Sequence, residues 1–146
     1  MVSKIDITYS EIVNFVDRYS TTAPEFDCII GIARGGVVPA TMLAYKLNIK
    51  NFYTIHLSSY DNNNKRGTIF EKVPLDVKNI INKRVLFVDD IADSGYTLEF
   101  VNKAYKRYTL LSEYFVCIEK LNTIFKPTYS GLLIDTKCWV NFPWEI

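Results

Sequence analysis

The hydrophobic and polar positions of this chain follow two periods, one typical of helices and one of buried strands. Near the start, Thr8 and Glu11 have the spacing of a capping box, and apolar residues then recur at helical intervals to about Tyr19. By contrast, nearly every residue is apolar in the stretches 28–33 and 85–88. Such uninterrupted runs are typical of strands that helices cover on both faces of a sheet.

Helices and strands are predicted to alternate along the chain. A second helix is expected after the turn at residues 34–36, with Pro39 in its first turn, and a third after the turn that ends at Thr97. Further strands are expected at residues 52–57, 114–118 and 132–134. This order predicts an α/β fold in which a mostly parallel central sheet is flanked by helices. Ligands of such folds bind at the carboxyl ends of the strands.

Composition narrows the class of protein. With 146 residues and 49% hydrophobic content, the chain is long enough for one domain, residues 1–146, and too short for two ordinary ones. Its 17 basic and 16 acidic residues nearly balance, so neither nucleic acid nor an anionic membrane is an expected partner. The three cysteines lack Cys-x-x-Cys spacing, which favours reduced thiols and a cytoplasmic location. With no signal-peptide pattern and no apolar run of about 18 residues, neither secretion nor a membrane span is expected.

The stretch after the second buried run carries the clearest chemistry. Asp89 and Asp90 come where that strand should end, and adjacent strand side chains diverge, so they can address vicinal hydroxyls or a hydrated divalent cation. A turn with Ser94, Gly95 and Thr97 then opens a helix and offers N–H groups and hydroxyls to a phosphate. Taken singly, each part also fits an ordinary strand end or helix cap. Together they predict a site for ribose 5-phosphate.

A second loop with similar features follows the first buried run. Arg34, Gly35 and Gly36 lie between a strand and a helix, where converging N–H groups and a guanidinium suit a pyrophosphate. A tight turn with a surface arginine is the plainer alternative. The polar stretch 58–67 lacks periodicity and is expected to be a lid or a solvated loop, in which Arg66 could bring a positive charge to a leaving pyrophosphate.

The last third of the chain contributes candidates for recognising a base. Lys120 follows the apolar run 114–118, so its ammonium group is expected at a carboxyl end, where it can donate to a carbonyl. Trp139 can stack on a purine, while the peptide groups beside Val140 bond the polar edge of the ring. The alternative for Trp139, and more so for Trp144, is packing in the core or between subunits.

These motifs resemble a known family. The stretch 85–98 is similar to the phosphoribosyl pyrophosphate signature of the type I phosphoribosyltransferases, with Tyr96 at a position of the phosphate loop where glycine is common. Residues 58–67 resemble the flexible hood of the purine enzymes, and residues 135–145 resemble the end of the xanthine-guanine phosphoribosyltransferases. The resemblance extends from about residue 28 to residue 146 and implies the type I phosphoribosyltransferase fold with a flexible hood loop.

The resemblance implies a magnesium-dependent purine salvage enzyme. Such an enzyme transfers the 5-phosphoribosyl group of phosphoribosyl pyrophosphate to a 6-oxopurine (guanine, xanthine or hypoxanthine), giving a nucleoside 5'-monophosphate such as GMP and pyrophosphate. Asp93 would be the catalytic residue and exchange a proton with the purine N7. A non-proline cis peptide is expected at the Arg34–Gly35 bond. The implied binding residues are Asp89, Asp90, Ile91, Ala92, Ser94, Gly95, Tyr96 and Thr97 for the ribose phosphate, Arg34, Gly35 and Arg66 for pyrophosphate, Lys120, Trp139 and Val140 for the purine, and Asp90 and Asp89 for Mg²⁺, directly or through water.

Two other functions fit the same fold. The nearer one is a phosphoribosyltransferase for another base, such as orotate, uracil or adenine, which Lys120 and Trp139 disfavour. The other is a phosphoribosyltransferase-fold regulator that senses nucleotides or binds nucleic acid, and the near-neutral charge argues against it. Since related enzymes are dimers or tetramers, a homodimer or homotetramer is expected.

Overall fold

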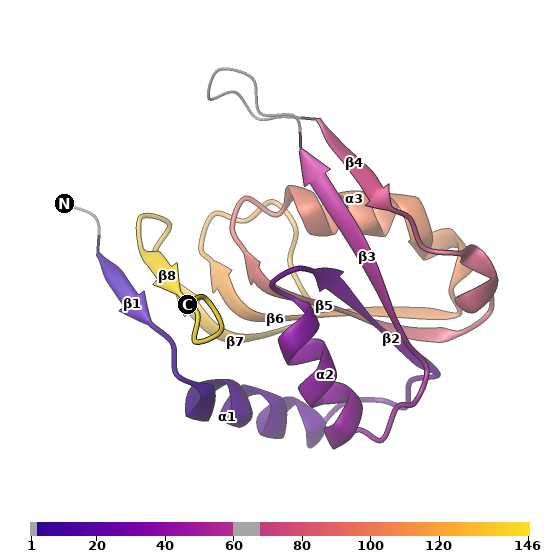
Figure 1. Ribbon diagram of the computed structural model, residues 1–146, viewed down its shortest axis with the longest axis horizontal. Helices are drawn as coiled ribbons and strands as arrows, with labels where there is room; N and C mark the ends of the chain where they lie inside the picture. Colours follow the sequence, from indigo (N-terminus) through magenta and orange to yellow (C-terminus); the bar gives the residue numbers. More distant parts are fainter. Residues whose placement is uncertain (1–2, 60–67) are drawn as a thin grey trace.

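In residues 3–59 and 68–146, which the computed structural model describes, six strands form one central sheet (Figure 1). The strand order is β4-β3-β2-β5-β6-β7, and neighbouring strands are parallel except for β3 and β4. This arrangement confirms the predicted α/β fold with a mostly parallel sheet. The strands are β2 (Cys28–Ala33), β3 (Phe52–Ser59), β4 (Ile69–Val73), β5 (Arg84–Ala92), β6 (Leu111–Lys120) and β7 (Tyr129–Ile134).

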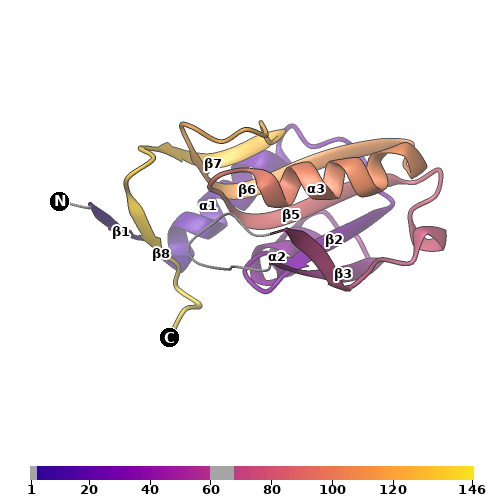
Figure 2. The same cartoon turned by 90° about the horizontal axis from the view of Figure 1, so that it is seen from above.

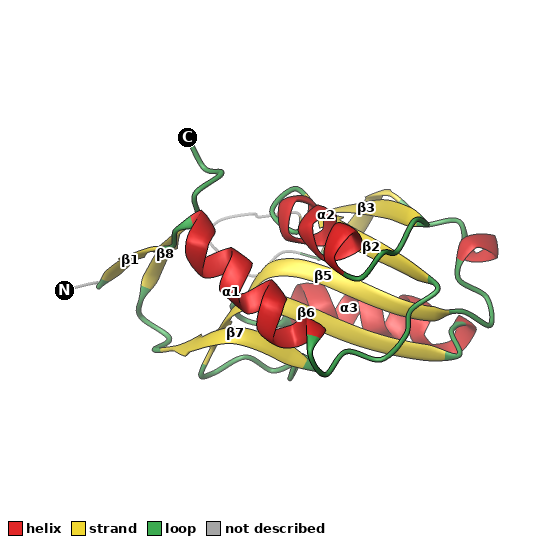
Figure 3. Ribbon diagram, turned by 90° about the horizontal axis from the view of Figure 1, so that it is seen from below, coloured by secondary structure: helices red, strands yellow, loops and turns green. Residues whose placement is uncertain are grey.

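Helices cover both faces of this sheet. One face carries α1 (Tyr9–Ser20) and α2 (Val37–Lys46), and the other carries α3 (Tyr96–Tyr105) (Figures 2 and 3). Two short 3-10 helices, η1 (Val77–Asn79) and η2 (Lys106–Tyr108), lie in connections. Among the helices described here, none is long and apolar enough to cross a membrane.

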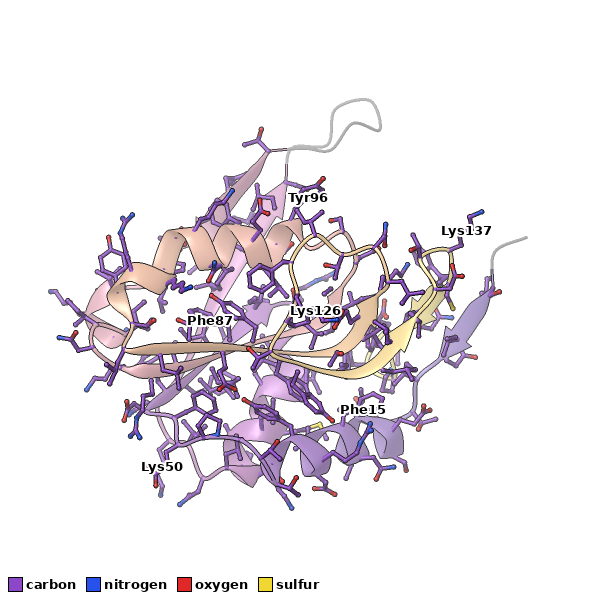
Figure 4. The ribbon with its side chains drawn as sticks, turned by 180° about the vertical axis from the view of Figure 1, so that it is seen from behind. Phe15, Lys50, Phe87, Tyr96, Lys126 and Lys137 are labelled. Atoms are coloured by element: carbon purple, nitrogen blue, oxygen red, sulfur yellow. The ribbon has the colours of Figure 1, made fainter. Side chains whose placement is uncertain are left out.

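Each face of the sheet has its own apolar core. In the buried run of β5, Leu86 and Val88 pack into the core under α1 and α2, whereas Val85 and Phe87 pack into the core under α3. Figure 4 shows Phe15 of α1 and Phe87 on opposite sides of the sheet. The uninterrupted apolar run therefore reflects burial on both faces, as expected for a parallel strand between two helical layers.

The first helix begins with the predicted capping box. The Thr8 hydroxyl accepts a hydrogen bond from the Glu11 N–H at 3.1 Å, and the Glu11 carboxylate accepts one from the Thr8 N–H at 3.2 Å. Such a cap contributes about 1 kcal/mol to helix stability. The helix then buries the apolar side chains that the periodicity selected, Ile12, Phe15, Val16 and Tyr19.

Three strands were not predicted. β4 pairs antiparallel at the edge of the main sheet, and β1 (Lys4–Asp6) pairs parallel with β8 (Trp139–Asn141) in a separate two-stranded sheet. β1 and β8 have three residues each and join opposite ends of the chain, so their pairing leaves no local periodicity to detect. Of the polar stretch 58–67, residues 58 and 59 belong to β3 and residues 60–67 lie outside the described residues.

The boundary of β5 also differs from the prediction. The strand was expected to end before Asp89, but it continues to Ala92. It does so because Asp89 pairs with Val116 and Ile91 pairs with Ile118 in the neighbouring strand β6. The acid pair therefore lies on the part of β5 that pairs with β6, just beyond the last pair with β2 at Val88.

Candidate active site

The loops at the carboxyl ends of β2, β5 and β6 border three adjoining cavities. One of about 230 Å³ lies between the end of β5 and the loop that leads into α3. A second, of about 600 Å³, lies between the loop after β2 and residues 144–146. A third, of about 190 Å³, is lined by Lys120 and Trp139. Asp90 lines all three cavities, so the loops that the sequence singled out do meet at one edge of the sheet.

The two acids of β5 have different surroundings. Asp89 is buried, and its Oδ1 accepts a hydrogen bond from the Asp90 N–H at 2.8 Å. Burial, and then the charge of Asp90, raise the pKa of Asp89 well above its usual value. Asp90 faces the loop after β2, where a Cβ added to Gly35 would overlap its carboxylate. Without a side chain, Gly35 lets the carboxylate come this close, and a Cβ there would require the Asp90 side chain to shift.

The loop between β5 and α3 has the features of a phosphate site. Gly95 is the N-cap of α3 with a φ of 92°, a left-handed conformation that favours glycine, and as a glycine it provides no side-chain hydrogen bond to this helix terminus. Ser94 and Thr97 line the adjoining 230 Å³ cavity, so their hydroxyls, together with the N–H groups at the N-terminus of α3, can donate hydrogen bonds to an anion there. Tyr96, the first residue of α3, does not line this cavity, which is also bordered by Asp89, Asp90, Ile91 and Ala92.

The loop after β2 borders the largest of the three cavities. Arg34 and Gly35 line it together with Asp90. The loop lies tightly against β5, since a Cβ on Gly36 would overlap the Val88 carbonyl oxygen. As at α3, the N-cap residue of α2 is a glycine, here Gly36, and provides no side-chain cap. The loop therefore combines the Arg34 guanidinium with the N-terminus of α2. These two kinds of donor suit an anion with several oxygens.

The position of the cis peptide bond in this loop differs from the prediction. The non-proline cis bond joins Ala33 to Arg34, one residue before the expected Arg34–Gly35 bond. A Gly-Gly turn signals close backbone approach but does not identify which of its peptide bonds is cis. Arg66, predicted to reach the same anion, lies outside the described residues.

The smallest cavity brings together residues from three distant segments. Asp93, Lys120, Trp139 and Val140 all line it. The Lys120 Nζ lies 3.6 Å from the Asp93 Oδ1 and donates a hydrogen bond to the Thr136 carbonyl oxygen at 3.1 Å. Lys120 is the last residue of β6, at the carboxyl end where the sequence predicted it. Its side chain is only 9% exposed, so the lining of this cavity includes a nearly buried ammonium group.

Hydrogen bonds to the small sheet orient Trp139. Its indole Nε1–H donates to the Asn141 Oδ1 at 3.0 Å, and the Asn141 Nδ2–H donates to the Asp6 Oδ1 at 2.9 Å. These contacts link β8 to β1, and 59% of Trp139 is exposed. An exposed indole with a fixed plane beside a cavity is suited to stacking on an aromatic ring.

A family model described as "Phosphoribosyl transferase domain" matches residues 11–121. The chain belongs to this family. Among solved structures, a purine phosphoribosyltransferase from Pyrococcus horikoshii Ot3 is 27% identical, with a TM-score of 0.86 over 98% of this chain and 95% of that one. A hypothetical protein from Neisseria gonorrhoeae with bound ppGpp is 28% identical, with a TM-score of 0.84 over 100% and 91%. The Helicobacter pylori xanthine-guanine-hypoxanthine phosphoribosyltransferase shares the fold at 18% identity, with a TM-score of 0.77 over 100% and 95%.

Family and fold confirm the predicted membership among the type I phosphoribosyltransferases and support phosphoribosyl transfer as the activity. The end of β5 and the loop after it belong to the stretch 85–98, which resembles the phosphoribosyl pyrophosphate signature. The lining of the cavities also includes a carboxylate that was not among the predicted site residues. Glu145 lines both the 600 Å³ and the 190 Å³ cavity, and its charge adds to the burial that raises the pKa of Asp90.

Sequence reasoning did not select Glu145 because it lies well beyond the last predicted strand, at residues 132–134. Its carboxylate accepts a hydrogen bond from the Phe142 N–H at 2.8 Å, which closes a turn around Pro143. Trp144 in this turn lines the 600 Å³ cavity and stacks on Phe142, with ring centroids 4.9 Å apart. The Pro-Trp-acid ending was the available signal, but only the folded turn brings its carboxylate to this phosphoribosyltransferase site.

Proposed function

We propose that this phosphoribosyltransferase transfers the 5-phosphoribosyl group from phosphoribosyl pyrophosphate to a 6-oxopurine. The observation that carries the proposal is that Asp90 and Ile91 line both the 230 Å³ cavity and the cavity of Lys120 and Trp139. A sugar in the first cavity and a base in the second would be adjacent, as bond formation between them requires. The products are the nucleoside 5'-monophosphate and pyrophosphate.

The donor would bind across two loops. Its 5-phosphate would accept hydrogen bonds at the N-terminus of α3 from Ser94 and Thr97, while Asp89 and Asp90 hold the ribose hydroxyls. Its pyrophosphate would lie against Arg34 and Gly35. As the purine nitrogen attacks the anomeric carbon, the bond to pyrophosphate breaks, its electron pair leaves with pyrophosphate, and positive charge develops on the ribose.

Magnesium is part of the proposal because the donor set suits it. Mg²⁺ in phosphate sites commonly uses one or two carboxylates and completes its shell with substrate oxygens and water. Asp90 supplies such a carboxylate at all three cavities, and Asp89 could act through water. The described residues include no cluster of three or more His, Cys, Asp or Glu side chains able to hold a metal. When bound, the ion would neutralise charge on the departing pyrophosphate.

The acceptor would be recognised by charge and by stacking. The nearly buried Lys120 ammonium group can donate to an oxygen at purine C6 but meets a second donor in the amino group of adenine. Trp139 would stack on the ring and the peptide groups of Val140 would bond its edge. Asp93 would take the proton that the purine loses at N7, and with 64% of its side chain exposed it can pass that proton to water.

A nucleotide-sensing role is the second candidate. The Neisseria gonorrhoeae protein, at 28% identity, was solved with bound ppGpp. That nucleotide combines a guanine with pyrophosphate groups, the two chemistries to which Lys120, Trp139 and Arg34 are suited here. If this chain binds it in the same cavities, ppGpp will compete with phosphoribosyl pyrophosphate.

Pyrophosphate release, measured with magnesium and phosphoribosyl pyrophosphate, tests both candidates. Guanine, xanthine, hypoxanthine, adenine, uracil and orotate are offered separately. Turnover is expected with one or more oxopurines and at least about tenfold less with adenine. Turnover only on adenine, uracil or orotate would assign another base. No turnover on any base, together with tight ppGpp binding, would favour the regulator.

A further inference from the structure

We propose that the connection between β6 and β7, residues 121–128, is a positioning element for the phosphate loop, and that an ion pair between Glu119 and Lys126 fixes it. The inference rests on the proposed function only in assigning the donor phosphate to the loop before α3. The match to the family model ends at residue 121, so nearly all of this connection lies beyond it.

The phosphate loop rests directly on the connection. The Ile124 N–H donates a hydrogen bond to the Ser94 carbonyl oxygen at 2.8 Å. A Cβ on Gly95 would overlap the Thr123 Oγ1 and lie 2.7 Å from the Phe125 backbone nitrogen. The backbone of Gly95, and with it the N-terminus of α3, is therefore placed by residues 123–125. A shift of these residues would move the N–H groups that face the phosphate.

The Glu119–Lys126 pair is the charged contact that holds the connection to the sheet. The Lys126 Nζ donates to the Glu119 Oε2 at 3.0 Å. The Glu119 side chain is 5% exposed and the Lys126 side chain is 79% exposed. A carboxylate this deeply buried needs a partner, so the pair ties Lys126 to the end of β6. The connection and Lys126 can be followed in Figure 4.

Packing and a local hydrogen bond keep the connection in shape. The Phe125 ring packs edge-on against Tyr114 of β6, with centroids 5.0 Å apart. The Thr123 hydroxyl donates to the Phe125 carbonyl oxygen at 3.1 Å. Of these contacts, the Glu119–Lys126 pair can be removed at an exposed side chain without opening the core.

The end of β6 contacts both the start of the phosphate loop and the connection that supports it. Glu119 and Lys120 are consecutive, so their side chains point to opposite faces of the sheet. Lys120 reaches Asp93 at the start of the loop, and Glu119 reaches the connection that supports Ser94 and Gly95. One strand end thereby couples the base cavity to the phosphate loop.

The test is calorimetric titration of phosphoribosyl pyrophosphate into wild type, Lys126→Met, Lys126→Arg and a matched control, Lys103→Met. Lys103 forms an exposed pair with Glu99 at 3.1 Å on α3, so its loss changes the net charge equally. Lys126→Met is expected to weaken binding about five- to tenfold, because a misplaced loop weakens charge-assisted hydrogen bonds. Lys126→Arg is expected to restore binding, and the control to leave it unchanged.

A positioning role also predicts that KM for the donor changes and that KM for the base does not. In Lys126→Met, KM for phosphoribosyl pyrophosphate rises while KM for the base stays near wild type, and the melting temperature falls because the buried Glu119 loses its partner. Unchanged donor affinity in Lys126→Met, or an equal loss in Lys103→Met, would overturn the inference. Since the titration needs no base, failure of the oxopurine assignment leaves it intact. A wild-type protein that binds no phosphoribosyl pyrophosphate would overturn both proposals. Glu119→Gln provides a second variant and is expected to weaken binding in the same direction.

Discussion

Two adjacent carboxylates of β5 differ in what surrounds them. Asp89 is buried within the strand and bonded to a backbone N–H, whereas Asp90 borders three cavities. Holding a charge as buried as that of Asp89 lowers the stability of the ligand-free protein. A ligand that stabilises the ionised carboxylates offsets this loss of stability. The cost of burying their charge therefore favours binding of such a ligand.

This environment makes stability depend on pH. A carboxylate whose folded pKa exceeds its ordinary 3.8 stabilises the fold below that value and loses this contribution as the pH rises through the folded pKa. Scanning fluorimetry between about pH 4 and 8 should show the melting temperature of wild type falling, by about 3 °C for each kcal/mol lost. Burial also raises the pKa of Asp90, so Asp89→Asn is expected to flatten part of this dependence and to weaken ribose binding.

A control variant and the known behaviour of Asp27 separate the effect of Asp89 from other causes of pH dependence. Asp17→Asn removes a half-exposed surface partner of Lys46 and should leave the curve parallel to wild type. Hydrogen bonds from Arg84 lower the pKa of Asp27 to about 2, so its contribution is lost mainly below about pH 4 and changes stability in the opposite direction. If Asp89→Asn followed the wild-type curve, the burial of Asp89 would not be the cause.

At the other end of the site, Asp93→Asn is expected to lower kcat about 100-fold, since proton transfer to a positioned carboxylate is lost. Affinity for phosphoribosyl pyrophosphate should stay within about twofold, because Asp93, although it lines both the donor and the base cavity, has its carboxylate 3.6 Å from the Lys120 ammonium group on the base side. Steady-state kinetics and donor titration measure the two effects. The exposed Asp135→Asn is the matched control. Loss of donor binding in Asp93→Asn would show that Asp93 acts on the sugar instead.

Among the elements, the short pair β1–β8 has a defined task. Asp6 on β1 and Asn141 on β8 form the hydrogen-bonded series that ends at the Trp139 indole. Asn141→Ala should free the indole to rotate and raise KM for the base about threefold, the loss expected for one exposed hydrogen bond. KM for phosphoribosyl pyrophosphate should not change. Asn51→Ala, which removes a similar contact to the Asp27 carbonyl oxygen, is the control. Equal effects in the two variants would exclude a role of β8 in orienting the indole.

Elements with a local signal were predictable and those without one were not. The capping box at Thr8 and the apolar run at residues 85–88 depend on neighbours in sequence, and both were confirmed. β1 and β8 pair across almost the whole chain, so neither could be recognised alone. The extension of β5 through the acids depends on the register with β6, which the polarity of Asp89 and Asp90 conceals.

At the scale of the whole molecule, the parallel sheet explains how much of the site could be predicted. Arg34, Asp89 and Lys120 each follow or end an apolar run, so the topology alone brings them to one edge. Glu145 and the support of Gly95 by residues 123–125 depend on turns that form only in the folded chain. Neither has a spacing that sequence reasoning could use.

The position of Asp90 has a consequence for the order of events. One carboxylate borders the places proposed for sugar, pyrophosphate and base. A ligand that neutralises or coordinates the Asp90 carboxylate from one cavity changes the electrostatic free energy of binding in the other two. By thermodynamic linkage, ligands in those cavities change its affinity by the same factor. Donor and acceptor then bind with a shared coupling energy, and saturation with one substrate shifts the apparent affinity for the other by the same factor in either direction.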